Sequence, residues 1–138
     1  MNSSENHALI AEATRARSKA YAPYSQFQVG AALLLRDGTC IHGCNVENAA
    51  YSLCHCAERT AIGTAIAAGY RLEDFKAIAV VADTEQIISP CGACRQVLFE
   101  LCGPDLAILL GNLQGEILET TAGALLPLAF HPGHLAQP

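Results

Sequence analysis

Two short segments of the chain carry residues whose types and spacing suit metal chemistry. One is Cys56–Glu58, which reads Cys-Ala-Glu, and the other is Pro90–Cys94, which reads Pro-Cys-Gly-Ala-Cys. Three soft thiolates with a preference for tetrahedral coordination indicate zinc. Because Cys91 and Cys94 are three positions apart, a helix would place both on one face, one turn apart. Three protein ligands leave the fourth zinc position open to water, as in catalytic rather than structural sites.

The glutamate of the first segment suits proton transfer better than metal binding. Glu58 lies two positions after Cys56, so it projects to a different side of a helix start from the metal ligand. We expect it to reach a water at the open zinc position and to pass protons to a substrate. Zinc with three thiolates carries a net negative charge, which two helix N-termini and a hydrogen bond from Arg59 to the sulfurs would offset.

The same residues have simpler interpretations when each is taken singly. Cysteines are often small core residues, and we expect this of Cys40, Cys44 and Cys102. A Cys-x-x-Cys pair alone suits redox chemistry or structural zinc equally well. The two segments together are far more specific. Cys54 and His55 are rival metal ligands beside Cys56; a closed structural site using Cys54 as fourth ligand is the alternative from a different class of protein.

Composition favours one folded domain over residues 1–138. The chain is 51% hydrophobic and 15% charged, which is enough to bury a core. It has no apolar run long enough to span a membrane. Its first seven residues lack the basic flank and apolar block of a signal peptide, so we expect a cytoplasmic protein that binds no membrane.

Charge and cysteine content narrow the choice of partner. Thirteen acidic residues against eight basic ones give a formal net charge of -5, and no basic stripe is present to neutralise phosphates. We therefore expect no nucleic-acid partner and a small neutral or cationic ligand. The chain has seven cysteines, an odd number that, without a secretion signal, favours metal binding or core packing over disulfides.

The first half of the chain is predicted to form a helix, a hairpin and a second helix. The first helix runs from about Glu5 and ends before Pro23, because the residue preceding proline avoids helical geometry. Alternating apolar residues predict a strand over 27–35, and Asp37-Gly38 predicts a tight turn into a return strand over 39–46. The second helix begins at Cys54 or Cys56, ends at Ala68, and is terminated by Gly69.

The second half is predicted to add three strands and a helix. Buried strands are expected over 77–82 and 106–110, and a short strand over 116–119. Between the first two, a helix capped by Ser89 with Pro90 at its first position ends near Gly103. The order α-β-β-α-β-α-β-β predicts an α/β fold, a single-domain α/β/α layer sandwich with a mixed five-stranded sheet. The tail, which includes the metal-like spacing His131-x-x-His134, is expected to be mostly irregular and to bind no metal.

The sequence as a whole resembles the short, homotetrameric, zinc-dependent cytidine deaminases of nucleoside salvage. The resemblance covers nearly the whole chain and is carried by five motifs: Tyr24–Gly30, Gly43–Tyr51, Cys56–Thr60, Ser89–Gln96 and Leu125–Pro127. The zinc-deaminase signature places the metal ligand two residues before the glutamate, which in this chain is Cys56. The fold implied is the cytidine deaminase-like layer sandwich.

What the resemblance implies is a complete site. It assigns one zinc per chain to Cys56, Cys91 and Cys94, and the proton shuttle to Glu58. By the same likeness, Asn45 and Glu47 hydrogen-bond the ribose hydroxyls, Phe27 lines the nucleoside pocket and the backbone at Ala57 reads the pyrimidine edge. Ala49, Tyr51 and Phe130 match positions that family members lend to a neighbouring subunit, with Phe130 stacking on the base. The chain would then be a homotetramer with shared active sites. Eight residues, 131–138, follow Phe130, where many short family members end almost at once.

The implied reaction is hydrolysis of cytidine or 2′-deoxycytidine to the uridine and ammonia, for pyrimidine salvage. A related deaminase for a nucleoside antibiotic such as blasticidin S is the alternative, although the Asn45-x-Glu47 pair favours an unmodified ribose. A polynucleotide-editing deaminase would share the zinc motif, but it needs basic grooves that this acidic chain does not offer. The preference between cytidine and deoxycytidine does not follow from the sequence.

Overall fold

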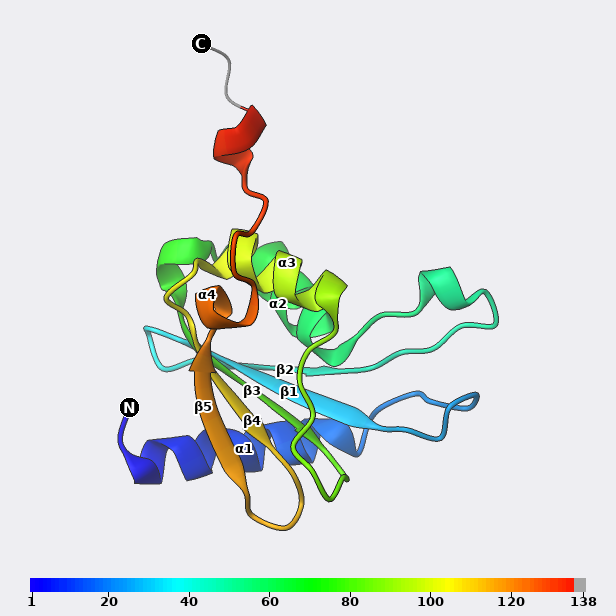
Figure 1. Cartoon of the computed structure of the whole chain (residues 1–138). Coiled ribbons are helices and arrows are strands. Elements are labelled where there is room, and N and C mark those ends of the chain that lie inside the picture. Colours follow the sequence, from blue (N-terminus) through cyan, green and yellow to red (C-terminus); the bar gives the residue numbers. More distant parts are fainter. Residues whose placement is uncertain (136–138) are drawn as a thin grey trace.

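Five strands form one mixed sheet in the order β2-β1-β3-β4-β5, seen in the computed structural model that describes residues 1–135 (Figure 1). β1 pairs antiparallel with both β2 and β3, β3 pairs parallel with β4, and β4 pairs antiparallel with β5. The strands are β1 (Val29–Leu35), β2 (Cys40–Cys44), β3 (Phe75–Ala82), β4 (Ala107–Gly111) and β5 (Ile117–Thr121).

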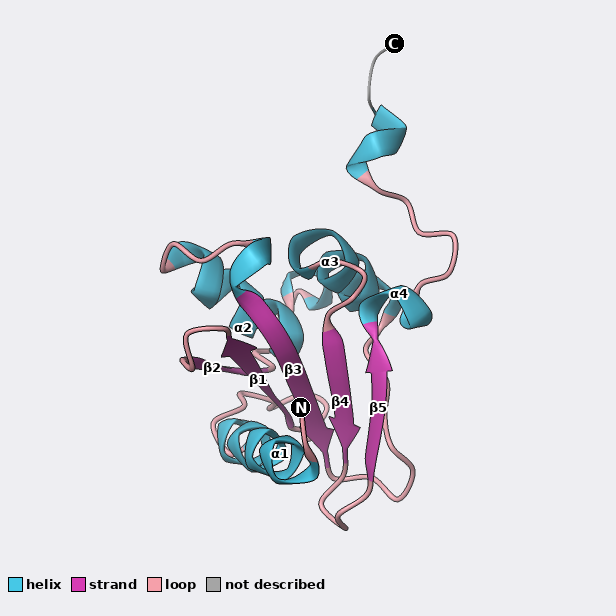
Figure 2. Cartoon of the chain, turned by 90° about the vertical axis from the view of Figure 1, so that its left-hand side faces the viewer, coloured by secondary structure: helices cyan, strands magenta, loops and turns pink. Residues whose placement is uncertain are grey.

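Helices cover both faces of the sheet, which confirms the predicted layer sandwich (Figures 1 and 2). α1 (Ser3–Arg17) lies on one face, and α2 (Ala57–Ala67) and α3 (Gly92–Cys102) lie on the other. Each face has its own core because side chains alternate along the strands. In β1, for example, Leu33 packs in the cluster under α2 and α3, whereas Ala32 packs in the cluster under α1.

The elements α1, β1, β2 and α2 form close to where the sequence predicts them. α1 begins two residues earlier than expected, because the Asn2 side chain caps it in a capping box with Glu5. Asp37-Gly38 makes the predicted turn between β1 and β2, and Gly38 has a φ of 92°. α2 ends as expected before Gly69, which has a φ of 103°.

The start of α3 differs from the prediction. Ser89 does not cap this helix, and Pro90 is not its first residue, because α3 begins at Gly92 with Cys91 as its N-cap. The Sγ of Cys91 accepts a hydrogen bond from the Cys94 N–H at 3.4 Å, in the role that a serine oxygen was expected to take. Ser89 and Pro90 instead bond to the Arg95 guanidinium.

The C-terminal part holds a short helix that the sequence did not predict. α4 (Ala122–Leu125) follows β5 directly, capped by the Thr121 side chain. The chain then leaves the body of the protein and ends, within the described residues, in a 3-10 turn, Pro132–Leu135 (Figure 1). The predicted irregular tail is thus largely extended away from the sheet, and its last residues, 136–138, lie outside the part described.

Across residues 1–135, every helix is too short or too polar to cross a membrane.

Candidate metal centre and active site

The N-termini of α2 and α3 bring three cysteine sulfurs together. The Sγ atoms of Cys56, Cys91 and Cys94 all lie within 4.8 Å of one another, and those of Cys56 and Cys91 are 3.9 Å apart. Tetrahedral zinc with Zn–S bonds near 2.3 Å requires sulfurs about 3.8 Å apart. The donor set and the spacing therefore fit a zinc ion with one position left for water.

Backbone geometry explains why the sulfurs meet. Cys56 is the N-cap of α2 and Cys91 is the N-cap of α3, so both side chains stand at the positive end of a helix. α2 approaches β2 at Gly43, where an added Cβ would lie 2.4 Å from the Ala57 carbonyl oxygen and 2.6 Å from the Ala61 nitrogen. A glycine on β2 and alanines on α2 thus allow the helix to lie directly on the sheet edge.

A positively charged side chain next to the sulfurs offsets the negative charge of ionised thiols. Arg59 Nη2 donates to Cys56 Sγ at 3.2 Å, while Arg59 Nε is buried and has no hydrogen-bond partner within the described chain. A hydrogen bond from Cys94 and then one from Arg59 lower the pKa of the Cys56 thiol to about 5, against the opposing effect of burial. The hydrogen bond with Cys56, together with burial, raises the pKa of the Cys94 thiol.

Glu58 is the one buried carboxylate beside this cluster. It is only 4% exposed, whereas most acidic side chains of a globular protein face water. Burial raises the pKa of its carboxyl group, and the neighbouring Cys56 thiolate adds to the effect. Glu58 also lines the cavity that opens from the metal site. A carboxyl group that is buried from solvent and lines a cavity suits a general acid–base role.

The cavity has a volume of about 340 Å³ and holds most of the predicted pocket residues. The residues that line it are Ser25, Phe27, Val29, Asn45, Glu47, Cys56, Ala57, Glu58, Ile88, Ser89 and Cys91. The volume lies at the lower end of the range for small-molecule sites. Four of the predicted substrate-binding positions, those at 27, 45, 47 and 57, are therefore brought to one cavity with the metal cluster.

Two polar residues of this cavity also organise its wall. Asn45 accepts from the Val29 N–H at 2.8 Å and donates to the Phe27 carbonyl at 2.8 Å. Glu47 accepts from the N–H groups of Tyr24 and Ser25 and from the Ser25 hydroxyl. These bonds hold the pKa of Glu47 below its usual value, with the Ser25 side chain contributing most. These bonds hold an anionic carboxylate in the lining of the cavity.

The remaining predicted contact residues lie outside this cavity in the isolated chain. Ala49, Tyr51 and Phe130 are all exposed, and none of them lines it. Tyr51 is 72% exposed and packs edge-on against Tyr24 with ring centroids 6.0 Å apart. Phe130 is on the extended C-terminal segment and makes a ring contact with His134 at 5.4 Å. One chain alone does not bring these three residues to its own metal centre.

The rival ligands are arranged differently from the cluster. Cys54 Sγ accepts from the Asn48 N–H at 3.3 Å and donates to its carbonyl, and it is not part of the sulfur group. His55 is exposed and is likewise outside the sulfur group. Cys102 is buried in the core, as expected, whereas Cys40 and Cys44 are only half-buried. All seven cysteines are free thiols.

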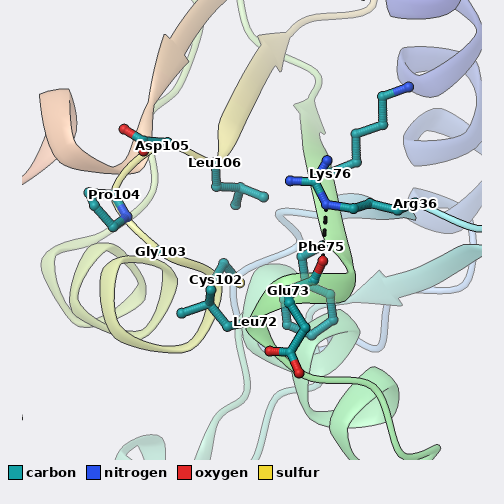
Figure 3. Close-up of a pocket in the computed structure, with 10 residues that line it drawn as sticks. All are labelled: Arg36, Leu72, Glu73, Phe75, Lys76, Cys102, Gly103, Pro104, Asp105 and Leu106. Atoms are coloured by element: carbon teal, nitrogen blue, oxygen red, sulfur yellow. Dashed lines mark hydrogen bonds between the residues drawn. The ribbon is translucent and has the colours of Figure 1, made fainter.

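A cavity at the opposite end of the sheet offers no comparable chemistry. It has a volume of about 240 Å³ and lies between the start of β3 and the end of α3 (Figure 3). Its polar contact is a hydrogen bond from Arg36 Nε to the Glu73 carbonyl at 3.0 Å, and its single cysteine is the buried Cys102. Mixed charges and a lone thiol give it no metal-ligand set.

A second group of possible metal ligands, Glu12, Cys40 and His42, joins α1 to β2. Its carboxylate is already paired, on one oxygen with Arg15 and on the other with His42 Nε2 at 2.6 Å. These contacts indicate that the group is an ion-pair network between α1 and β2.

Several residues of the site were not singled out from the sequence. Ser25 and Ile88 line the cavity, and Ser89 lines it rather than capping a helix. Arg95 and Gln96 bind the segments around it. Ser25 and Ser89 fall within motifs that carried the family resemblance, but only the folded chain shows what they contact.

A family model supports the same interpretation of the geometry. Residues 3–110 match the model described as the cytidine and deoxycytidylate deaminase zinc-binding region, and this range contains all three clustered cysteines and Glu58. The chain belongs to this family. The resemblance and the zinc cofactor expected from the sequence are thereby confirmed.

Individual relatives agree with the family. The chain is 60% identical over 122 residues to the cytidine deaminase of Sporosarcina psychrophila, covering 88% of each chain. The crystal structure of cytidine deaminase from Burkholderia pseudomallei has a TM-score of 0.89 at 60% identity, covering 94% of this chain and 100% of that one. The blasticidin-S deaminase of Bacillus cereus is 30% identical over 114 residues, covering 77% of this chain and 79% of that one.

Proposed function

We propose that this chain is a zinc-dependent hydrolase that converts cytidine and 2′-deoxycytidine to uridine and 2′-deoxyuridine, with release of ammonia. The observation that carries the proposal is the cluster of three sulfurs beside the buried Glu58 at one end of a cavity of nucleoside size. The 60% identity to curated cytidine deaminases, against 30% to a blasticidin-S deaminase, favours cytidine over the antibiotic. Pyrimidine salvage is the process that such a reaction would serve.

The chain's own residues divide the work of the reaction. Cys56, Cys91 and Cys94 hold the zinc, and Arg59 offsets the charge of their thiolates. Bound zinc supplies Lewis-acid activation of the attacking water. The Ala57 N–H, at the first position of α2, has no acceptor within the helix, and it faces the base as a donor to the pyrimidine edge.

Glu58 moves both protons of the attacking water. It takes the first and delivers it to ring N3 while the oxygen adds to C4. It then transfers the second to the 4-amino group, the C4–N bond breaks, and ammonia leaves. Because Glu58 is buried, its protons pass to substrate rather than to bulk water.

The cavity wall recognises the sugar and the base. Asn45 and Glu47 line the same cavity as Cys56 and Cys91, and their positions match ribose-binding residues of the family. A carboxylate has about four acceptor positions, so Glu47 can bind its loop and still accept from a ribose hydroxyl. Phe27, 41% exposed, offers an apolar ring to the nucleoside at the same opening.

We further propose that the active unit is a homotetramer with sites shared between chains. Ala49, Tyr51 and Phe130 are exposed and outside the cavity, so they would act in a neighbouring subunit's site, Phe130 by stacking on the base. Cytoplasmic action is proposed because three free thiols at a metal site require a reducing compartment.

A substrate comparison tests the proposal. Purified holoenzyme is incubated separately with cytidine, 2′-deoxycytidine, blasticidin S and single-stranded DNA, and deaminated product is quantified by liquid chromatography. We expect turnover of the two nucleosides and none of the polymer. Higher kcat/KM for blasticidin S than for cytidine, or no turnover of either nucleoside by zinc-loaded protein, would overturn the assignment.

A further inference from the structure

The first turn of α3 contacts three separate parts of the site through consecutive residues. Cys94 contributes its sulfur to the metal cluster. Arg95, the next residue, binds the metal loop, defined here as residues 88–91. Gln96 binds the C-terminal arm, defined here as residues 126–135. One short stretch of helix therefore contacts the sulfur cluster, the loop that carries Cys91 and the arm that carries Phe130.

Arg95 makes three hydrogen bonds with a single guanidinium. Its Nε donates to the Pro90 carbonyl at 2.8 Å, its Nη2 to the Ser89 hydroxyl at 2.7 Å, and its Nη1 to the Leu125 carbonyl at 3.0 Å. The first two acceptors immediately precede Cys91, so they fix how its thiol enters the cluster. The third is the last residue of α4, from which the arm departs. A planar fork of donors can reach three acceptors at once, which a lysine ammonium on a flexible stem does not reproduce.

Gln96 holds the arm directly. Its Nε2 donates to the Phe130 carbonyl at 2.8 Å. Within the described residues 127–134, the other hydrogen bonds lie inside the arm itself, between His131, Gly133 and His134. Most of the arm is exposed, and Leu128 is fully open to water with a left-handed φ of 54°. Gln96 thus tethers the Phe130 backbone to α3.

We propose that Arg95 and Gln96 are positioning residues that link the C-terminal arm to the metal loop, so that Phe130 is presented in one fixed direction from the helix that also carries Cys94. The inference rests on the proposed function, in which Phe130 stacks on a base bound in a neighbouring chain. An untethered arm spends only part of its time in the orientation for stacking, and apparent affinity falls in proportion to that fraction. Gln96 therefore acts on substrate binding through Phe130, while Arg95 acts on both the loop and the arm.

A double-mutant cycle tests the role of Gln96. KM for cytidine, kcat and zinc content are measured for Gln96→Ala, Phe130→Ala and the double variant. Glu100→Ala, at an exposed position of the same helix, is the control.

Phe130→Ala should raise KM about 5- to 150-fold, the range for losing one base–aromatic stack. Gln96→Ala should raise it roughly 2- to 10-fold, as for one hydrogen bond, with kcat and zinc unchanged. Because Phe130→Ala keeps the backbone carbonyl that Gln96 binds, adding Gln96→Ala to it should have no further effect.

The cycle separates two kinds of failure. If Phe130→Ala raises KM and Gln96→Ala does not, or if the two effects multiply, Gln96 does not act through Phe130 and this inference is overturned while the proposed function stands. If Phe130→Ala leaves KM unchanged, the stacking role itself is wrong, and the inference about the arm is overturned with it.

Zinc retention tests the role of Arg95 without reference to activity. Arg95→Lys and Arg95→Ala are compared with the parent by competition with a chelator, and folding is checked by circular dichroism. Zinc should dissociate about 10- to 100-fold more readily from both variants, the usual cost of losing a group that orients metal ligands, and KM for cytidine should also rise. If the Arg95 variants do not fold, Ser89→Ala removes one of the three contacts and should weaken zinc retention in the same direction. Parent-like zinc retention in a folded Arg95→Lys protein, or in Ser89→Ala where that variant is used, would overturn this part.

Discussion

At the scale of single residues, burial and charge separate the groups at the metal centre by task. Cys56 and Arg59 form a hydrogen-bonded pair of opposite charge, which suits holding a cation and offsetting the negative charge of the thiolates. Glu58, two positions after Cys56 and directly before Arg59, is kept out of water and has its pKa raised by that burial. Neighbouring residues in the sequence thus have different environments, and those environments account for their different proposed roles.

Replacing Glu58 by glutamine tests the proton-transfer role. The amide matches the shape of the carboxyl group but cannot carry protons, so Glu58→Gln should retain zinc and fold while kcat falls. The loss expected for general acid–base catalysis is about 10²- to 10⁴-fold. Glu100→Gln, on the exposed side of α3, controls for the loss of a carboxylate in general. Turnover of Glu58→Gln within a few-fold of the parent would remove this residue from the mechanism.

Arg59 should matter through its charge and its contact with the Cys56 sulfur. In Arg59→Ala the thiolates lose a 3.2 Å hydrogen bond and the nearest positive charge, so zinc affinity or turnover should fall about 10- to 100-fold. Arg59→Lys keeps the positive charge but lacks the planar guanidinium donor, so its zinc affinity or turnover should lie between those of the parent and Arg59→Ala. Arg36→Ala, at the cavity at the opposite end of the sheet, serves as the control. Zinc affinity and rate both equal to the parent's would reduce Arg59 to a structural residue.

At the scale of elements, the position of the metal ligands depends on how closely α2 lies on β2. Gly43→Ala would place a Cβ 2.4 Å from the Ala57 carbonyl, so α2 must move away from the sheet and carry Cys56 and Glu58 with it. We expect a lower melting temperature and weaker zinc retention. Gly63→Ala is the matched control within α2, because its Cβ would meet nothing within 4 Å. It should stabilise the protein by roughly 0.5–1 kcal/mol. Equal zinc retention in the two variants would contradict the close-contact argument.

Elements whose limits depend on neighbouring residues form where the sequence predicts them. Local patterns predicted what local physics controls: the alternation in β1, the turn at Gly38 and the end of α2 at Gly69. The cap of α3 was predicted wrongly, because a cysteine sulfur takes the place that serine usually fills, and Ser89 is drawn to Arg95 instead. Arg95 and Gln96 read as ordinary helix residues in the sequence. Their partners lie elsewhere in the chain, and no local pattern records such pairings.

At the scale of the whole molecule, a single chain does not bring all of the predicted substrate-binding residues to its own cavity. Phe130 and Tyr51 are exposed and lie outside the cavity of their own chain. The arm extends away from the body of the protein (Figure 1). A shared-site homotetramer gives these side chains a function, and it can be tested by mixing two defective chains.

The mixing experiment combines Glu58→Gln, which lacks the proton shuttle, with Phe130→Ala, which binds substrate weakly. Some sites in a mixed oligomer pair an intact Glu58 with an intact Phe130 from the neighbour. Activity at low cytidine concentration should therefore exceed that of either variant alone after subunits exchange. Each variant mixed with itself is the control. Light scattering should report a tetramer, and a fully active monomer would end the shared-site proposal whatever the mixing gave.

The most direct test of a zinc-dependent deaminase is to measure metal and reaction on one sample. Metal-free protein is titrated with zinc, and ammonia release from saturating cytidine is recorded together with bound zinc by atomic spectroscopy. Activity should rise in proportion to zinc and reach its plateau at one ion per chain. Cys91→Ala should bind little zinc at this site and release no ammonia, while Cys40→Ala, outside the sulfur cluster, should follow the parent. Full activity in metal-free protein, or a zinc-loaded chain that releases no ammonia from cytidine, would contradict the account.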